Sequence, residues 1–177
     1  MLSQLRRIVQ DVAQEPVLNN ALAGLVSNVK NALKTECCSV YLADYDQQHF
    51  MLMATDGLNP EAVGQISIGF SEGLIGWVGQ REEPINLAQA HLHPRFKVTP
   101  EVSEDRFSAF LGCPIIHHRK VLGVLTIQQG ESRVFSEDEE SFLVTLGVQL
   151  ASVLVNAEMR QAASQNSKQQ KSTGQLL

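Results

Sequence analysis

Thiol chemistry is the first possibility that the sequence raises, because two of its three cysteines, Cys37 and Cys38, are neighbours. Neither forms a CxxC pair with the other or with Cys113, and on a strand the two neighbours would point to opposite faces. A reactive thiolate usually has nearby positive charge that lowers the pKa of the thiol, and no basic cluster flanks these residues. We therefore expect reduced, structural thiols and no redox switch.

Histidines could supply metal ligands, and four of the five occur in close pairs, His91 with His93 and His117 with His118. A zinc site needs three or four converging ligands, and the spacing gives neither pair a third partner. The chain also lacks the GxSxG, HExxH, P-loop and dinucleotide-binding motifs. The sequence therefore predicts no metal, no cofactor and no catalytic residue.

Glycines in the segment FSEGLIGWVG, residues 70–79, indicate a turn that opens a short helix. The bare N–H groups at the start of this helix, from Gly73 to Ile75, could bind a ligand carboxylate or phosphate. Close packing of the helix at Gly76 is the simpler explanation of the same glycines, and both roles can hold together. Trp77 is expected to pack in the core.

Further candidate ligand contacts come from residues on the predicted strands and from the loop that precedes residue 108. Side chains two apart on a strand share a face, although the sequence does not say which face is inward. Arg106 could hold an amino-acid carboxylate through a bidentate contact, or it could be solvated and paired with Asp105 or Glu104. The candidate ligand-binding residues are Ser39, Tyr41, Phe70, Gly73, Leu74, Ile75, Phe96, Arg106, Phe107, Ser108 and Phe110.

Helices that could position these residues are predicted by apolar residues at intervals of three and four. Two helices lie before residue 35, and Pro16 separates them. The last helix begins at Ser136, where Glu139 completes a capping box, and its apolar pattern continues to about Arg160. One face of this helix must be buried.

Strands are predicted from short apolar runs bounded by turn residues. A hairpin joins residues 37–43 to residues 49–54 across the turn sequence DYDQ, and two further strands flank the sequence HHRK. Between them the sequence predicts a short strand in GQISIGF, before the glycine turn, and another at residues 84–87. Residues 88–107 lack periodicity, so we expect a long loop with about one helical turn that serves as a lid.

Composition limits the class of protein. The chain has 177 residues, 44% of them hydrophobic, which suits one domain with a buried core. Its 14 Lys and Arg against 19 Asp and Glu give a net charge of -5, which disfavours binding to nucleic acid. No uninterrupted apolar stretch could span a membrane and no export signal is evident, so we expect a cytoplasmic protein. Residues 164–177 are polar and are predicted to be a linker or tail.

Six segments resemble the signature of GAF domains: EGLIGWV, PINL, HPRF, LGCPI, LGVLTI and FSEDE. The opening MLSQLRRIVQDVAQEP and the stretch CCSVYLADYDQQHFMLMATDGLNP are similar, more narrowly, to the GAF domains of phosphoenolpyruvate-protein phosphotransferases of the nitrogen phosphotransferase system. The resemblance implies an α+β fold for residues 1–163. A six-stranded antiparallel sheet would carry the N- and C-terminal helices on one face and a ligand pocket, roofed by the short helix and the loop, on the other.

The resemblance also implies a regulatory function. Enzymes of this family take phosphate from phosphoenolpyruvate onto a histidine and pass it to a carrier protein, and their GAF domain resembles a sensor of nitrogen status, with glutamine as the leading ligand. No histidine here lies in the family's phosphorylated-histidine motif, so the chain alone is expected to be inactive. We expect it to bind glutamine or a related metabolite, to control autophosphorylation of catalytic domains that follow, and to form a homodimer through its terminal helices.

Other ligands and functions of this fold leave different marks in a sequence. The chain lacks the NKFDE set of cyclic-nucleotide binders and the linking cysteine of tetrapyrrole binders. A ligand-free module for dimerisation and signal transmission remains an alternative, because the last helix has a second apolar face at Val144, Val148, Ala151 and Val155. A free methionine sulfoxide reductase on this fold is another alternative, which would need cysteines around the cavity.

Overall fold

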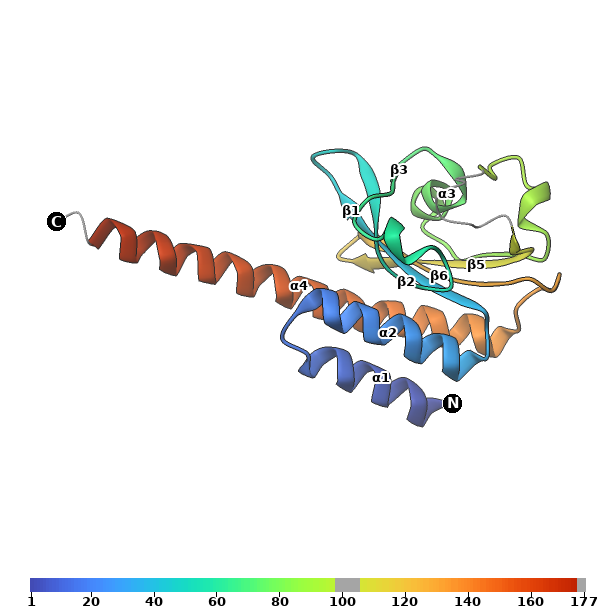
Figure 1. Ribbon diagram of the computed structural model, residues 1–177, viewed down its shortest axis with the longest axis horizontal. Helices are drawn as coiled ribbons and strands as arrows, with labels where there is room; N and C mark the ends of the chain where they lie inside the picture. Colours follow the sequence, from blue (N-terminus) through green and yellow to red (C-terminus); the bar gives the residue numbers. More distant parts are fainter. Residues whose placement is uncertain (98–105, 175–177) are drawn as a thin grey trace.

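The computed structural model describes residues 1–97 and 106–174, with side chains as far as Lys171. One antiparallel sheet of six strands, in the order β3-β2-β1-β6-β5-β4, organises the domain (Figure 1). Three helices cover one face of the sheet and a short helix covers the other, which is the predicted α+β arrangement. The strands are β1 (Cys37–Asp44), β2 (His49–Asp56), β3 (Ser67–Gly69), β4 (Ile85–Leu87), β5 (Ala109–His117) and β6 (Lys120–Gln129), and the helices are α1 (Leu2–Gln14), α2 (Leu18–Leu33), α3 (Gly73–Arg81) and α4 (Glu137–Gly174), with short 3₁₀ turns at η1 (Pro60–Ala62) and η2 (Ala90–Leu92).

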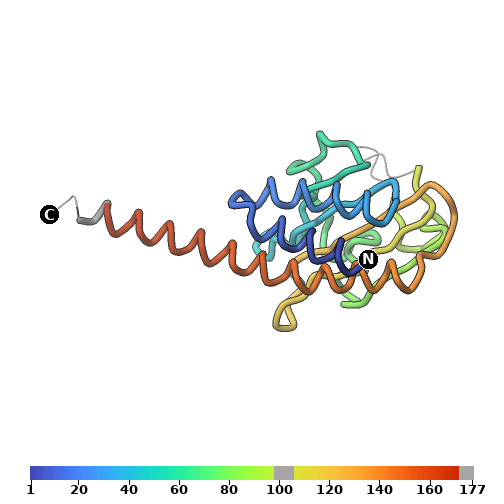
Figure 2. Tube along the Cα trace, turned by 90° about the horizontal axis from the view of Figure 1, so that it is seen from below, coloured from blue at the N-terminus to red at the C-terminus, as the bar shows by residue number. Residues whose placement is uncertain are grey.

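The helical layer buries the apolar stripes that the sequence predicts. Leu22, Leu25 and Val29 recur along α2 at intervals of three and four and are at most 1% exposed. α2 and α4 lie on the sheet, and α1 packs on both helices from outside, as Figure 2 shows from below.

The sheet separates two hydrophobic clusters. The helix-side core lies between the sheet and the three long helices, and it includes Leu111 and Ile115 of β5, Leu125 and Ile127 of β6, and Leu143, Leu146 and Leu150 of α4. The second cluster lies between the sheet and α3, and we call it the roof-side cluster: Cys37, Tyr41, Phe50, Leu52, Leu58, Ala62, Leu74, Ile75, Val78, Ile85, Ala90, Phe107, Phe110, Val121 and Val124.

Both predicted hairpins are confirmed, and local chemistry explains their turns. In the β1–β2 turn, Asp44 Oδ1 accepts hydrogen bonds from the backbone N–H of Asp46 at 3.0 Å and of Gln47 at 3.1 Å. In the β5–β6 turn, His118 and Arg119 have φ values of 48° and 65°, the conformation that a two-residue hairpin loop requires.

α4 begins where the capping box predicts but continues well past Arg160, through most of the segment predicted to be a linker. Residues 161–173 are mainly Gln, Ala, Ser and Lys with no proline, and most of these residue types tolerate a helix well without burial. The described part of that segment is therefore an exposed helix, and a domain boundary at residue 163 stays a prediction. α4 is long and apolar enough to cross a membrane by length and composition, but the core helix of a soluble protein meets the same two criteria. The apolar residues of α4 in the helix-side core pack on the sheet.

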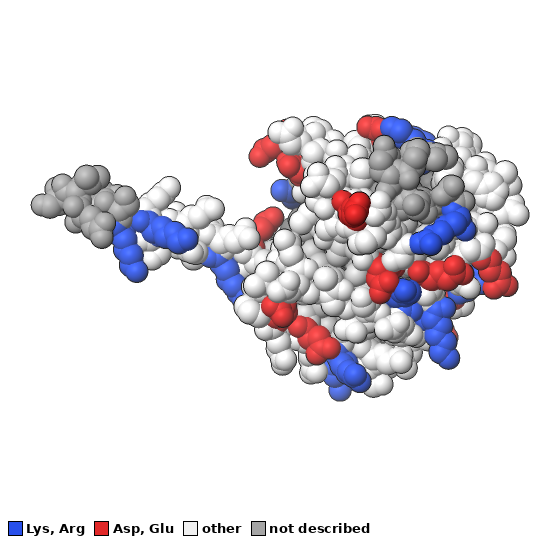
Figure 3. All heavy atoms as spheres, viewed as in Figure 1, with Lys and Arg blue, Asp and Glu red and all other residues white. Residues whose placement is uncertain are grey.

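Charged side chains of both signs are interspersed over the body of the molecule in the view of Figure 3. No single sign dominates this face, although the chain as a whole carries a net charge of -5. The projecting part of α4 carries Arg160, Lys168 and Lys171 and no acidic residue after Glu158.

Candidate ligand site on the roofed face of the sheet

Alternation along β1 assigns the predicted strand residues to a face. Tyr41 belongs to the roof-side cluster, and Ser39 Oγ lies 3.7 Å from Cys37 Sγ on the same face. Cys38 and Val40, which alternate with them, belong to the helix-side core. The face that sequence reasoning left open is therefore the face beneath α3.

α3 forms the roof over this face. Leu74, Ile75 and Val78 project into the roof-side cluster and are 7%, 3% and 0% exposed. Two glycines allow the close approach: a Cβ on Gly76 would lie 2.8 Å from a carbonyl oxygen of the preceding turn, and a Cβ on Gly112 of β5 would lie 2.9 Å from the Val78 side chain. The packing explanation of Gly76 is thus confirmed, and a ligand role for the N–H groups from Gly73 to Ile75 stays a prediction.

Most of the predicted contact residues meet in this cluster. The buried members are Tyr41, Leu74, Ile75, Phe107 and Phe110, and Phe70 and Phe96 pack against the cluster while partly exposed. Gly73 opens α3 with a φ of 60°, a conformation that glycine adopts without strain. The apolar part of the predicted site is therefore brought together.

Ser108 and Arg106, two further predicted contact residues, are not members of the roof-side cluster. The Ser108 backbone accepts a hydrogen bond from Ala90 N–H at 2.8 Å and donates one to Gln129 O at 3.0 Å, so it ties η2 to the end of β6. Arg106 is exposed, and its guanidinium lies 4.6 Å from the centre of the Phe107 ring. Its predicted alternative partners, residues 104 and 105, lie outside the described residues.

A row of polar side chains crosses the floor of the roof-side cluster, and Ser39 was its only predicted member. Ser39 pairs with Thr55 of β2 on one side and with Thr126 of β6 on the other. Ser39 Oγ and Thr55 Oγ1 are 2.9 Å apart, and Cys37 Sγ lies 3.8 Å from Gln128 Oε1, to which it donates. We call Cys37, Ser39, Thr55, Thr126 and Gln128 the polar row.

Thr126, which lies next to Ser39 in this row and next to Gly112 on its other side, leaves hydrogen-bonding capacity unused. It is 1% exposed, and its Oγ1 has no hydrogen-bond partner within the described part of the chain. A buried hydroxyl without a partner costs about 1–3 kcal/mol. A buried arrangement that costs stability is typical of a functional position.

The sequence contained a signal for Thr126 and Gln128, but the apolar residues around them in the strand made it easy to miss. The run LGVLTI was interpreted as a hydrophobic strand, yet Thr126 and Gln128 are two residues apart and alternate with Leu125 and Ile127 of the helix-side core. Side chains alternate between the two faces of a strand. Polar residues at every second position, with apolar residues between them, therefore indicate a polar patch on one face of the sheet.

The loop after β4 is fastened to α3 by described contacts. The His93 ring stacks on Trp77 with the ring centres 4.3 Å apart, and Arg95 Nη1 donates to Ser71 O at 3.3 Å. Lys97 forms an ion pair with Glu72, which lowers the pKa of the Glu72 carboxyl. Trp77, predicted to lie in the core, is partly buried and packs against the roof-side cluster from the loop side.

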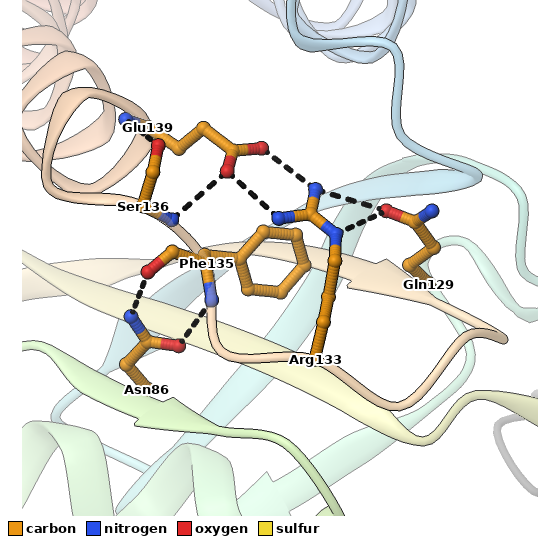
Figure 4. Close-up of polar contacts among 6 residues, drawn as sticks. All are labelled: Asn86, Gln129, Arg133, Phe135, Ser136 and Glu139. Carbon is orange, nitrogen blue, oxygen red and sulfur yellow. Dashed lines mark hydrogen bonds and ion pairs between the residues drawn. The ribbon is translucent and has the colours of Figure 1, made fainter.

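The start of α4 is held by a charged network beside the end of β6 (Figure 4). The predicted capping box is confirmed: Ser136 N–H donates to Glu139 Oε1 at 2.9 Å and Glu139 N–H donates to Ser136 Oγ at 3.2 Å. Arg133 donates to both Glu139 oxygens, at 2.9 and 2.8 Å, and to Gln129 Oε1 at 3.1 and 3.2 Å. The Arg133 hydrogen bonds are the largest cause that lowers the pKa of Glu139 to about 2.

Asn86 of β4 provides a second link to α4, also visible in Figure 4. Its side-chain amide donates to Phe135 O at 2.9 Å and accepts from Phe135 N–H at 3.0 Å, and it donates to Glu140 Oε2 at 3.3 Å. The neighbours of Asn86 on β4, Ile85 and Leu87, face the roof-side cluster. β4 therefore contacts both sides: Ile85 and Leu87 face the roof-side cluster, and Asn86 between them binds the start of α4.

The cysteines are buried free thiols, and they are divided between the two faces. Cys37 belongs to the roof-side cluster, whereas Cys38 and Cys113 lie in the helix-side core. Burial raises the pKa of Cys38 well above its usual value and that of Cys113 to about 12. This placement puts no pair of thiols beside the polar row, which disfavours the sulfoxide reductase alternative. The described residues also contain no group of three His, Cys, Asp or Glu side chains placed to hold a metal ion.

Comparisons with known proteins agree with this geometry. The family model of the GAF domain matches residues 18–154. The chain is 52% identical over 159 residues to proteins of the phosphoenolpyruvate-dependent phosphotransferase system from Escherichia coli K12 and Salmonella typhimurium LT2. The match covers 90% of this chain but 21% of each relative, so the chain spans about a fifth of their length.

Solved structures give the same result. The GAF domain of a phosphoenolpyruvate-protein phosphotransferase from Coxiella burnetii is 46% identical, with a TM-score of 0.87 over 91% of this chain and 96% of that chain. The corresponding Acinetobacter domain is 45% identical with a TM-score of 0.82 over the same shares. A free methionine-R-sulfoxide reductase from Neisseria meningitidis is similar at 19% identity and a TM-score of 0.75 over 88% of this chain and 89% of that chain, which shows a common fold alone. The chain belongs to the GAF family, and it is homologous to the GAF domains of phosphoenolpyruvate-protein phosphotransferases.

Proposed function

We propose that this chain is the metabolite-sensing regulatory domain of a cytoplasmic phosphoenolpyruvate-protein phosphotransferase of the nitrogen phosphotransferase system. It binds glutamine or a related indicator of nitrogen status beneath α3, and it controls autophosphorylation of the catalytic domains. The observation that carries the proposal is the unpaired hydroxyl of Thr126 in a polar row enclosed by the roof-side cluster. A ligand that supplies the missing partner gains free energy that the protein alone does not recover.

The apolar surroundings suit an amphipathic metabolite. Small-molecule sites are mostly hydrophobic, with a few polar groups that fix orientation, and the polar row among Tyr41, Leu74, Val78 and Phe110 has that composition. Glutamine combines an aliphatic chain with polar ends, so both parts of the site find a complement.

α4 is the output element in this proposal. Gln128 lies on the floor of the site, and the next residue, Gln129, holds the Arg133 guanidinium that binds Glu139 in the first turn of α4. Asn86 connects β4 to Phe135 at the same place. A ligand that shifts β4 or β6 would bias the position of α4, and coupling of about 1–3 kcal/mol is the usual scale of such effects.

A thermal-shift screen of this chain against amino acids, 2-oxoacids and nucleotides tests the proposal. A ligand that binds only the folded state raises the melting temperature by mass action, about 2.7 kcal/mol of stabilisation at 100 times the dissociation constant. We expect L-glutamine to raise the melting temperature in a saturable manner, and nucleotides to leave it unchanged. No shift with any compound of the panel would contradict metabolite sensing.

Dimerisation is a second proposal, because Val144 and Val148 on α4 are 38% and 59% exposed. Ala151, predicted on the same face, is instead buried in the helix-side core, so the exposed apolar face is narrower than the sequence indicates. Val144 and Val148 are four positions apart, so they lie next to each other on one face of α4, and a second copy of the chain could cover this small apolar strip. Dimerisation is compatible with sensing, since both copies would keep the roofed face free.

The Val148→Glu substitution should weaken this dimer, because it places a charge in an apolar contact. Size-exclusion chromatography with light scattering should give twice the chain mass for the wild type and the single chain mass for the variant. Val134→Glu is the matched control, since Val134 is 63% exposed but precedes α4. A monomeric wild type would contradict the proposal.

A further inference from the structure

We propose that Thr126 and Gln128 recognise an uncharged carboxamide group of the ligand, while its charged end stays at the rim of the roof. This inference rests on the function proposed above and names the chemical class that the site selects.

The free hydrogen-bonding groups of the floor match a carboxamide. Gln128 Oε1 is engaged by Cys37 Sγ, and Gln128 Nε2, with two N–H donors, donates to none of the described residues. Thr126 Oγ1 can donate one hydrogen bond and accept two, and it makes none there. A carboxamide presents one carbonyl acceptor and two N–H donors, so its carbonyl can face Gln128 while its amino group faces Thr126.

The absence of charge on the floor selects the amide over the acid. The buried polar side chains of the described residues are Thr35, Ser39, Thr126 and Gln128, and all four are uncharged. A carboxylate moved to this floor would lose its hydration without meeting a positive charge, which disfavours binding strongly. A neutral amide of the same shape avoids this loss.

Charged groups are found at the edge of the roof. Glu72 and Lys97 form an ion pair at the start of α3, and the exposed Arg95 donates to Ser71 O in the turn before this helix. An ammonium and a carboxylate at the other end of the ligand would remain partly hydrated among these side chains. The site therefore suits a molecule whose carboxamide is separated from its charged end by a short aliphatic chain.

Access to the floor requires α3 to move. Thr126 pairs with Gly112 across β5 and β6, and Val78 of α3 packs against Gly112, so α3 stands over the threonine. Thr126 Oγ1 is also closed to solvent, so a ligand must displace α3 side chains before it reaches the hydroxyl.

Calorimetric titration of this chain with L-glutamine, L-glutamate and 2-oxoglutarate tests the inference. The wild type should bind glutamine at least about tenfold more tightly than glutamate, and Thr126→Val should weaken glutamine about tenfold while leaving glutamate unchanged, the effect of one lost hydrogen bond. Without ligand, Thr126→Val should raise the melting temperature by about 2–4 °C, because it removes an unpaired buried hydroxyl at nearly constant volume.

Thr35→Val is the matched control. Thr35 is 6% exposed, its Oγ1 also has no partner among the described residues, and it lies outside the polar row at the α2–β1 junction. It should give a similar gain in melting temperature with wild-type affinity for glutamine. Wild-type affinity for glutamine in Thr126→Val, or equal wild-type affinity for glutamate and glutamine, would overturn the inference and leave metabolite sensing intact. A wild type that binds none of the three probes, nor any compound of the thermal-shift panel, would overturn both proposals.

Discussion

Replacing Gly123 by alanine is expected to destabilise the domain by about 3 kcal/mol or more, the upper range for overpacking in a core. A Cβ on Gly123 would lie 2.2 Å from Tyr41 O in the neighbouring strand β1. No side-chain rotation relieves a clash with backbone, so β1 and β6 must separate at the centre of the sheet. Urea unfolding followed by circular dichroism measures the loss.

Gly24→Ala is the matched control for this substitution. Gly24 lies within α2, and a Cβ there would meet nothing within 4 Å. Alanine in a helix is favoured over glycine by about 0.5–1 kcal/mol, so this variant should be more stable than the wild type. A Gly123→Ala protein as stable as the wild type would show that the sheet accommodates a methyl group, contrary to the close contact described.

Glu139→Gln should cost about 2–3 kcal/mol at pH 7, because Glu139 combines the capping box with a bidentate contact from Arg133. The glutamine can still accept from Ser136 N–H, but it has no charge with which to hold the Arg133 guanidinium. The Glu139 side chain is 13% exposed and the Arg133 side chain 31%, so solvent screens the pair only in part. Urea unfolding at neutral pH measures this cost, and Glu137→Gln, an exposed position in the same turn, should stay near the wild type.

The pH dependence gives a second measurement on the same pair. The folded-state pKa of Glu139 is about 2, below its ordinary value of 4.5, so its contribution is complete above about pH 5 and is lost as the pH falls toward 2. The stability difference between the wild type and Glu139→Gln should shrink over that interval. Lys30 also lowers the pKa of Asp56, so both proteins should lose some stability in acid. A constant difference between pH 7 and pH 2.5 would contradict the role of the charge.

Local signals were sufficient to predict most of the fold. Ser136 and Glu139 marked the start of α4, the Asp44 turn marked the first hairpin, and alternation in β1 grouped Ser39 with Tyr41. Each of these signals depends on residues within a few positions of one another, so each can be recognised without knowing how distant parts of the chain come together.

The polar features of the site could not be predicted in the same way. Asn86 is an ordinary residue of a short strand until it meets Phe135, which is 49 positions away. Thr126 matters because Ser39 and Gly112 flank it and α3 covers them, an arrangement that only the paired strands create. Ala151 was assigned to an exposed face because periodicity does not reveal how broadly a helix is covered.

The length of α4 turns small movements into large ones. Its 38 residues span about 57 Å, and the sheet and its neighbouring helices grip only the first half. A tilt of roughly 5° at the Arg133–Glu139 end would swing the far end of such a rod by about 5 Å, the rise of a whole helical turn. A small tilt at the start of α4 would therefore appear at its far end as a displacement of several ångströms, as at the free end of a long lever.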